Sequence, residues 1–163
     1  MLYLVDANVL IDANRDYYPI EAIPEFWEWL LEIGAAGKVK IPIEIYEEIT
    51  QGKEDELSKW ARETEVKEAL LLDEDVDIDL VQNVTEKGYA NDLSDIELSN
   101  VGRDPFLIAY ALARENCTIV TTEGSRPKRQ RSNRHIPDVC EDFGIRTINT
   151  FEFIKIMKFT TRS

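Results

Sequence analysis

Short apolar segments that alternate with helix-like segments are the feature that most constrains how this chain can fold. Residues 2–5 are apolar at every position, which is typical of a central strand in a parallel sheet that helices cover on both faces. Further short strands are expected at residues 39–41, 118–121 and 145–148. The sequence therefore predicts an α/β fold, namely a three-layer α/β/α sandwich with a mostly parallel central sheet.

Helical spacing of apolar residues and helix-end signals place the helices. Asp6 or Asn8 can cap a short helical turn, Pro42 suits the first turn of the next helix after residue 41, and Asp104 followed by Pro105 is a strong helix start. The stretch after Pro105 is apolar around its whole circumference, so that helix should be buried. The expected helices are 9–11, 21–36, 42–51, 54–62, 76–88, 92–98, 104–113, 137–143 and 150–157, while 69–72 is too short to assign.

Length and composition indicate a soluble protein with one core. At 163 residues and 44% apolar content, a single domain over 1–163 is expected, carrying an acidic helical insertion at about 63–99 and a basic loop at about 124–135. No apolar stretch approaches the roughly 20 residues that span a bilayer, and no leader-like segment is visible, so no membrane association and a cytoplasmic location are expected. Cys117 and Cys140 form no CxxC pair, and we expect both to be reduced.

The charge is strongly uneven along the chain. The formal net charge is -13, which argues against a simple electrostatic binder of nucleic acid. However, residues 126–134 hold five of the 19 basic residues and no acid, whereas residues 63–97 hold 12 acids and two lysines. We call residues 126–134 the basic strap. Three roles are open for it: a solvated loop, an arm that contacts RNA phosphates, or a docking site for an acidic partner.

Carboxylates follow several of the expected strands. Asp6 comes after the first strand, Glu48 lies in the helix after the second, Asp104 begins the buried helix and Glu123 follows the third strand. In parallel sheets the ligand site lies at the carboxyl ends of the strands. Clustered carboxylates repel one another unless a cation neutralises them, and a site of oxygen ligands without His or Cys favours Mg²⁺ or Mn²⁺.

Five segments together resemble the PIN-domain family of metal-dependent ribonucleases, which includes the VapC-type toxins of toxin–antitoxin pairs. The segments are VDANVLI, IPIEIYEEI, GRDPFLIAYALA, TIVTTE and FGIRTINTFEFI, and they span nearly the whole chain. Each is short and degenerate, but their order and spacing are collectively specific. The IDANRDYYP loop and the late IPDVCEDFGI segment are similar to those of a PIN-like subgroup.

The resemblance assigns site residues position by position. Asp6, Glu48 and Asp104 match the first three PIN acids, and Glu123 is the best match to the fourth, where the family more often has Asp. Because the basic strap follows Glu123 directly, two later acids are rival fourth ligands. The rivals are Asp138 and Asp142.

Neighbouring residues are candidates for supporting roles. Asn8 matches the small polar residue that orients the first aspartate or a metal-bound water in PIN domains. Asp12, with Arg15, could line the groove or could form a local turn or ion pair. The strap residues proposed to contact RNA are Arg126, Lys128, Arg129, Arg131 and Arg134.

The resemblance implies hydrolysis of RNA phosphodiester bonds with one or two Mg²⁺ or Mn²⁺ ions. It also implies that the chain is the toxin of a toxin–antitoxin pair, that an antitoxin is its partner, and that it forms a homodimer. The alternative is a catalytically weak PIN-like module that binds another protein. A third possibility, phosphoryl transfer through an aspartyl intermediate, wants a second Asp two residues after the first, and that position is Asn8.

Overall fold

The centre of the molecule is a five-stranded sheet in the order β3-β2-β1-β4-β5, with every pair parallel. The structure is a computed structural model that describes residues 1–161. The predicted α/β fold is confirmed, and the sheet is parallel throughout rather than mostly parallel. The strands are β1 (Leu2–Val5), β2 (Val39–Pro42), β3 (Leu71–Leu72), β4 (Cys117–Val120) and β5 (Arg146–Ile148).

Helices connect all five strands. In the first half of the chain they are α1 (Ala7–Asp12), its π-helical continuation η1 (Ala13–Tyr17), α2 (Pro24–Ala35), α3 (Ile43–Thr50), α4 (Glu56–Ala61) and α5 (Thr64–Leu70). In the second half they are α6 (Ile78–Asn83), its π-helical continuation η2 (Val84–Tyr89), α7 (Asp95–Val101), α8 (Asp104–Leu112), the 3₁₀ turn η3 (Arg131–Asn133), α9 (Ile136–Asp142) and α10 (Thr150–Ile156).

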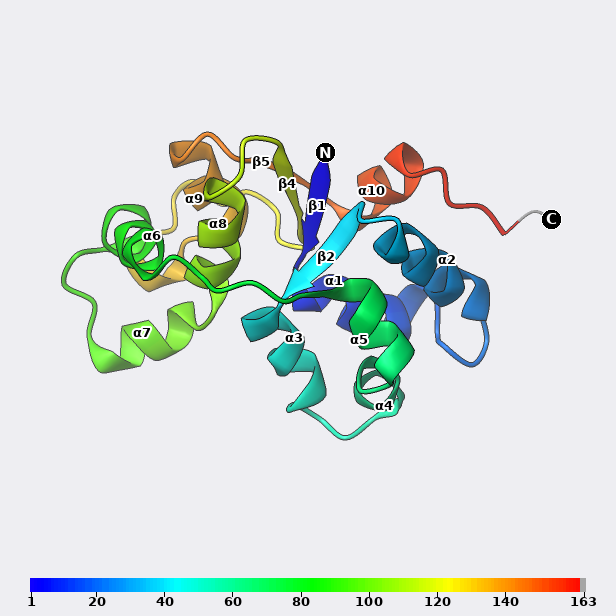
Figure 1. Ribbon diagram of the computed structural model, residues 1–163. Coiled ribbons are helices and arrows are strands. Elements are labelled where there is room, and N and C mark those ends of the chain that lie inside the picture. The colour runs from blue at the N-terminus through cyan, green and yellow to red at the C-terminus, as the bar shows by residue number, and fades with distance from the viewer. Residues whose placement is uncertain (162–163) are drawn as a thin grey trace.

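The helices form two layers, one on each face of the sheet. Helices α8 and α9 lie on one side of the strands, and α2 and α10 lie on the other (Figure 1). The second layer is joined to the sheet by aromatic contacts, because Phe153 of α10 lies 5.3 Å from the ring of Tyr3 and 5.7 Å from that of Trp29. Helix α8 is buried along most of its length, as its uniformly apolar sequence predicts.

Two local predictions are wrong, and a segment that the sequence left unassigned forms a strand. Residues 69–72, which periodicity leaves unassigned, end α5 and form the edge strand β3, which pairs with β2. Pro42 is the last residue of β2 and precedes α3 rather than occupying its first turn. Asp104 is already helical, with Arg103 at the N-cap, and its side chain makes no capping hydrogen bond. The carboxylate of Asp104 is therefore not committed to the end of its own helix.

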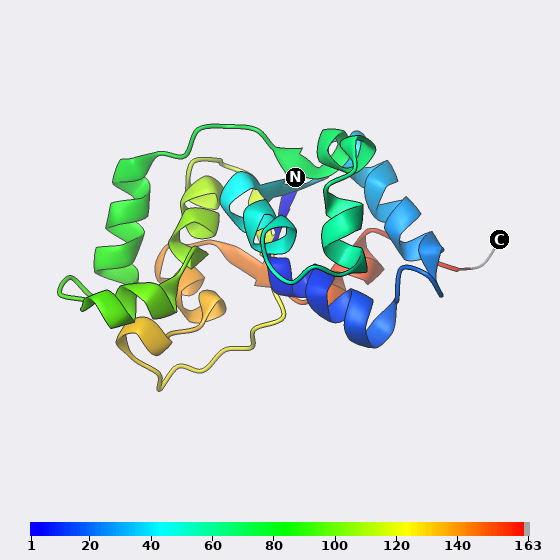
Figure 2. The same ribbon diagram turned by 90° about the horizontal axis from the view of Figure 1, so that it is seen from below.

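The strand order changes direction at β1 and β4, and we call the region outside their carboxyl ends the β1/β4 crevice. The chain winds outward through β1, β2 and β3 and then returns to β4 on the other side of β1, so these two strands mark the topological switch point. At their carboxyl ends the backbone N–H of Asp6 donates to the carbonyl of Val120 at 2.9 Å. Figure 2 looks at the molecule from the side to which these ends point.

No helix within residues 1–161 has the length and apolar character needed to cross a bilayer. Cys117 and Cys140 are both free thiols, as predicted.

Candidate functional site

Asp6 lies at the bottom of the crevice. It follows β1, its side chain is 3% exposed, and its Oδ2 accepts a hydrogen bond of 3.1 Å from the Thr121 hydroxyl just after β4. Burial raises the pKa of Asp6 to about 7; the bond from Thr121 opposes this, and the nearby charges of Glu123 and Glu48 add to it. A carboxyl with this pKa exchanges its proton near neutral pH, and a nearby positive charge would favour its ionised form.

Asp104, the first residue of α8, faces the same space. Burial, followed by the charges of Asp6, Glu123 and Glu48 in that order, raises the pKa of Asp104 to about 8. No side chain or backbone group within residues 1–161 donates a hydrogen bond to its carboxylate. Asp104 is thus a poorly solvated carboxyl with free acceptor oxygens, set among three other acids.

Glu48 and Glu123 complete the group from opposite sides. Glu48 lies on α3 with solvent contact, and its pKa is raised by partial loss of hydration while the charge of Arg103 lowers it. Arg103 is fixed along α3, since its Nη1 donates to the carbonyl of Glu44 at 2.7 Å and to Glu47 at 3.0 Å.

Glu123 is tied to the start of α9. Its Oε2 accepts a hydrogen bond of 2.7 Å from the backbone N–H of Ile136, and its own N–H donates to the Thr121 hydroxyl at 3.2 Å. Thr121 therefore links Glu123 to Asp6. The four acids predicted from the strand ends do share one electrostatic neighbourhood.

The donor set suits a hard divalent cation, because it consists of carboxylate oxygens. In the side-chain positions of residues 1–161, however, no three His, Cys, Asp or Glu side chains form a group that could hold a metal ion. The cluster is therefore coupled through charge but is not assembled as a finished set of ligands. Rotation of flexible side chains such as that of Glu48 is needed to bring the oxygens together.

The two rival acids have another role. Asp138 is buried, and its carboxylate accepts from the Ser125 hydroxyl at 2.5 Å and from the backbone N–H of Arg126 at 2.8 Å. Although burial opposes it, these bonds lower the pKa of Asp138. Asp142 forms an ion pair of 2.8 Å with Arg134. Both acids hold the strap, whereas the charge of Glu123 acts on Asp6 and Asp104, which favours Glu123 as the fourth member.

The predicted supporting residues lie on α1. Asn8 is exposed, and Asp12 is paired with Arg15 at 3.1 Å, which is the local ion pair that the sequence left open. Asp12 also borders a hollow with Tyr17 and Thr122, so it still lies near the end of β4.

The basic strap is docked on the acidic insertion of its own chain. Arg131 pairs with Asp92 and Glu97, each at 2.8 Å, and it lowers the pKa of Glu97 to about 2. Its φ of 55° is unusual for a residue other than glycine, and the ion pairs hold it there. Figure 2 shows the strap, in yellow, running out from the sheet to the side of α7.

Some basic side chains of the strap are bound to other parts of the chain, and others are exposed. Arg134 donates to the carbonyl of Gly88 at 2.6 Å as well as to Asp142, so it and Arg131 are engaged. The side chains of Arg126, Lys128 and Arg129 are exposed and make no ion pair within residues 1–161. His135, near the end of the loop, is hydrogen-bonded to the carbonyl of Gly124 at 2.8 Å. Three of the five predicted RNA contacts are therefore available to a ligand in this conformation.

One family model matches almost the whole chain. A family model described as Domain of unknown function (DUF4411) matches residues 3–161. This chain belongs to the DUF4411 family. All four acids of the site lie inside the matched range. No curated protein matches the sequence.

Sequence reasoning missed two residues of this DUF4411 site. Thr121 was assigned only to a strand, although a hydroxyl at the end of a strand beside an acid is a usable signal. Tyr89, whose pKa is raised by burial and then by the charges of Asp104 and Glu123, was not singled out. Its position at the site depends on the path of η2, which no local pattern indicates.

Proposed function

We propose that this DUF4411 protein is a metal-dependent endoribonuclease that uses Mg²⁺ or Mn²⁺. The single observation that supports it best is the convergence of Asp6, Glu48, Asp104 and Glu123 at the β1/β4 crevice, where burial and then the charges of neighbouring acids raise the pKa of Asp6 and Asp104. Such a cluster is unstable with all carboxylates ionised and gains stability when a cation is bound.

The four acids are the groups that would hold the ions, and no nucleophilic side chain is needed. When bound, the cation supplies a site where water is acidified and the leaving oxygen is neutralised. Thr121 orients Asp6 through their hydrogen bond, and burial of Asp6 excludes competing water. Glu123 is held in place by the N–H of Ile136, which leaves its second oxygen for the site.

RNA is the favoured substrate because the exposed strap residues offer positive charge next to an acidic site. Arg126, Lys128 and Arg129 can bind phosphates without reading sequence. Arg131 and Arg134 instead hold the strap in position, so their contribution to RNA binding is indirect.

The biological role that we propose is the toxin of a toxin–antitoxin pair, acting in the cytoplasm as a homodimer and restrained by an antitoxin. The family resemblance supports this role. Growth arrest on expression, relieved by Asp6→Asn, is the expected outcome in a bacterial host.

The catalytic proposal is tested with purified protein, single-stranded and structured RNA, and Mg²⁺, Mn²⁺ or EDTA. Asp6→Asn and Asp104→Asn should reduce the cleavage rate by at least about a hundredfold, by loss of charge at the ions. Asp16→Asn is the matched control, because Asp16 is an exposed acid that pairs with Arg15. Equal cleavage by wild type, site variants and the EDTA-treated sample would rule the nuclease out.

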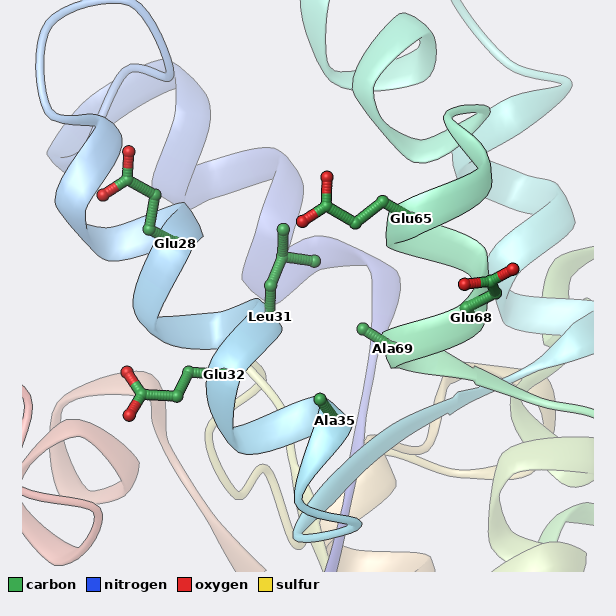
Figure 3. Close-up of a pocket in the computed structure, with 7 residues that line it drawn as sticks. All are labelled: Glu28, Leu31, Glu32, Ala35, Glu65, Glu68 and Ala69. Atoms are coloured by element: carbon green, nitrogen blue, oxygen red, sulfur yellow. The ribbon is translucent and has the colours of Figure 1, made fainter.

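A second candidate function, a protein-interaction module, is favoured by a groove whose lining includes none of the four acids of the crevice. A hollow of about 520 Å³ lies between α2 and α5, and Figure 3 shows its acidic rim around small apolar side chains. The rim residues are Glu28, Glu32, Glu65 and Glu68, and the apolar ones are Leu31, Ala35 and Ala69. None of the four glutamates has an ion-pair partner within residues 1–161.

The chemistry of this groove fits a basic amphipathic helix with small apolar residues on one side. A Lys/Ala/Leu helical peptide should bind the wild type and lose affinity for the double variant Glu65→Gln/Glu68→Gln, with Glu21→Gln/Glu25→Gln as control. Equal affinity for both variants would contradict a specific groove. RNA cleavage that is unaffected by the groove variant separates this function from the nuclease.

A further inference from the structure

The hydroxyl of Tyr89 is buried without a hydrogen-bond partner. The residue is 7% exposed, and its Oη is one of two buried side-chain polar atoms within residues 1–161 that lack a partner. Buried hydroxyls are usually paired, because the group loses its bonds to water on folding. An unpaired buried donor next to a cluster of acids therefore calls for a physical reason.

The surroundings of Tyr89 point to the carboxylate site. Tyr89 is the last residue of η2, which packs against α8 and α9. Helix α8 begins at Asp104, and α9 begins at Ile136, whose N–H donates to Glu123. After burial, the charges of Asp104 and Glu123 are the largest causes that raise the pKa of Tyr89, so its hydroxyl lies in their field.

Asp104 is the acid that complements this donor. Its carboxylate receives no hydrogen bond within residues 1–161, whereas Asp6 is bonded to Thr121 and Glu123 to Ile136. RNA is a poor alternative partner for the hydroxyl, because a side chain that is 93% buried cannot be reached by a phosphate without opening the fold. A buried donor without a partner and an acceptor without a partner thus come from η2 and α8, which pack against each other.

The backbone next to Tyr89 is held tightly. A Cβ atom on Gly88 would lie 2.7 Å from Cγ1 of Val139, so only glycine allows this approach to α9. The carbonyl of Gly88 also accepts the 2.6 Å bond from Arg134 of the strap. A π-helical turn such as η2 is rare and is frequently found at functional sites. These contacts keep Tyr89 at the site instead of letting it turn to solvent.

We propose that Tyr89 is a positioning residue of the carboxylate site, and that its hydroxyl donates a hydrogen bond to Asp104 when a divalent cation is bound. This inference rests on the proposed function for the presence of the cation. It assigns a role to the acidic insertion, which supplies Tyr89, and it explains why the hydroxyl has no partner when the acids are not drawn together.

The test compares Mn²⁺ affinity with thermal stability. Tyr89→Phe should weaken Mn²⁺ binding, measured by isothermal titration calorimetry, roughly tenfold, as is typical for loss of an outer-shell partner. Without divalent cations its Tm should be unchanged or higher, because the substitution removes a hydroxyl that has no partner. A structural role alone cannot lower affinity while sparing the cation-free Tm.

Tyr46→Phe is the matched control, since it also deletes a buried hydroxyl. The Tyr46 hydroxyl donates to the carbonyl of Ala61 at 2.5 Å, so this variant should have a lower Tm and unchanged Mn²⁺ affinity. Equal Mn²⁺ affinity in wild type and Tyr89→Phe, a fall in the cation-free Tm of Tyr89→Phe like that of Tyr46→Phe, or no Mn²⁺ binding by the wild type would each overturn the role of Tyr89. If Mn²⁺ binds and Tyr89→Phe weakens it while RNA is not cleaved, the inference stands and the nuclease proposal fails.

Discussion

The hydroxyl of Thr121 donates a hydrogen bond of 3.1 Å to Asp6, across 115 residues of sequence. The bond joins the carboxyl ends of β1 and β4 and fixes the most buried acid of the site. The same hydroxyl accepts from the N–H of Glu123, so one side chain orients two members of the cluster.

Thr121→Val should impair the site more than the fold. Loss of the donor removes the bond that lowers the pKa of Asp6, so the carboxyl should hold its proton more strongly and bind Mn²⁺ more weakly. The expected loss of stability is about 1 kcal/mol, measured by urea unfolding. Thr121→Ser keeps the hydroxyl and should retain most of the affinity; if Ser and Val behave alike in Mn²⁺ titrations, the bond has no role at the site.

The stability of the cation-free protein should fall as pH rises. The pKa values of Asp6 and Asp104 in the folded state are about 7 and about 8, against 3.8 as the ordinary value. Between about pH 4 and 8 the folded state therefore retains protons that the unfolded state has lost, and the free energy of unfolding decreases through this window. At about 1.4 kcal/mol for each pKa unit, these values set an upper limit of about 10 kcal/mol on the combined loss.

Thermal denaturation in EDTA at pH 5, 6, 7 and 8 checks this slope. Asp104→Asn should flatten it, because the amide does not titrate, and Mg²⁺ should raise the Tm more at pH 8 than at pH 5. A slope of the same size in Asp104→Asn and wild type would assign the effect to other groups.

Release of the strap should follow Arg131→Gln. The variant loses the ion pairs to Asp92 and Glu97, which lie at the surface, so the free energy of unfolding should change little. Trypsin cleavage after Lys128 and Arg129, followed by mass spectrometry, should become several times faster. Arg15→Gln removes an exposed ion pair elsewhere and should leave the rate at the strap unchanged; equal rates in all three proteins would show that Arg131 does not hold the strap.

Gly34→Ala should destabilise the protein although alanine is the better helix former. A Cβ atom at this position of α2 would lie 2.6 Å from Cδ2 of Leu70 and 2.7 Å from the carbonyl oxygen of Ala69, so α5 must move away. We expect a loss of about 1–3 kcal/mol in urea unfolding, as for other overpacked sites. At Gly124 an added Cβ meets nothing within 4 Å, so Gly124→Ala should be nearly neutral.

Much of the fold could be predicted because β1 is an apolar run, and because short segments with β-branched residues at β2, β4 and β5 lie between turn or helix signals. The edge strand β3 could not, since two residues carry no periodicity and Leu71 continues the apolar face of α5. The two π-helical turns were equally invisible, because a change of one residue in hydrogen-bond spacing leaves the apolar pattern nearly intact.

The part of the site that could be predicted is the set of acids at the ends of the strands. Asp6, Glu48, Asp104 and Glu123 were brought together by topology, which parallel strands imply. Whether Arg131 reaches RNA or Glu97 could not be settled from the sequence, because the ion pair joins residues 34 positions apart. Tyr89 has the composition of a core residue, and only its missing partner distinguishes it.

Both ends of the basic strap are bound to the same short helix, α9. Asp138 of α9 binds the strap where it leaves the sheet, at Ser125 and Arg126, and Asp142 of the same helix binds it at Arg134 where it returns. The number of residues between these two anchors can therefore change without moving the acids of the crevice. A peptide tag or protease site inserted after Lys128 should leave the acids undisturbed, which makes this segment a practical place for a fluorescent reporter of RNA binding.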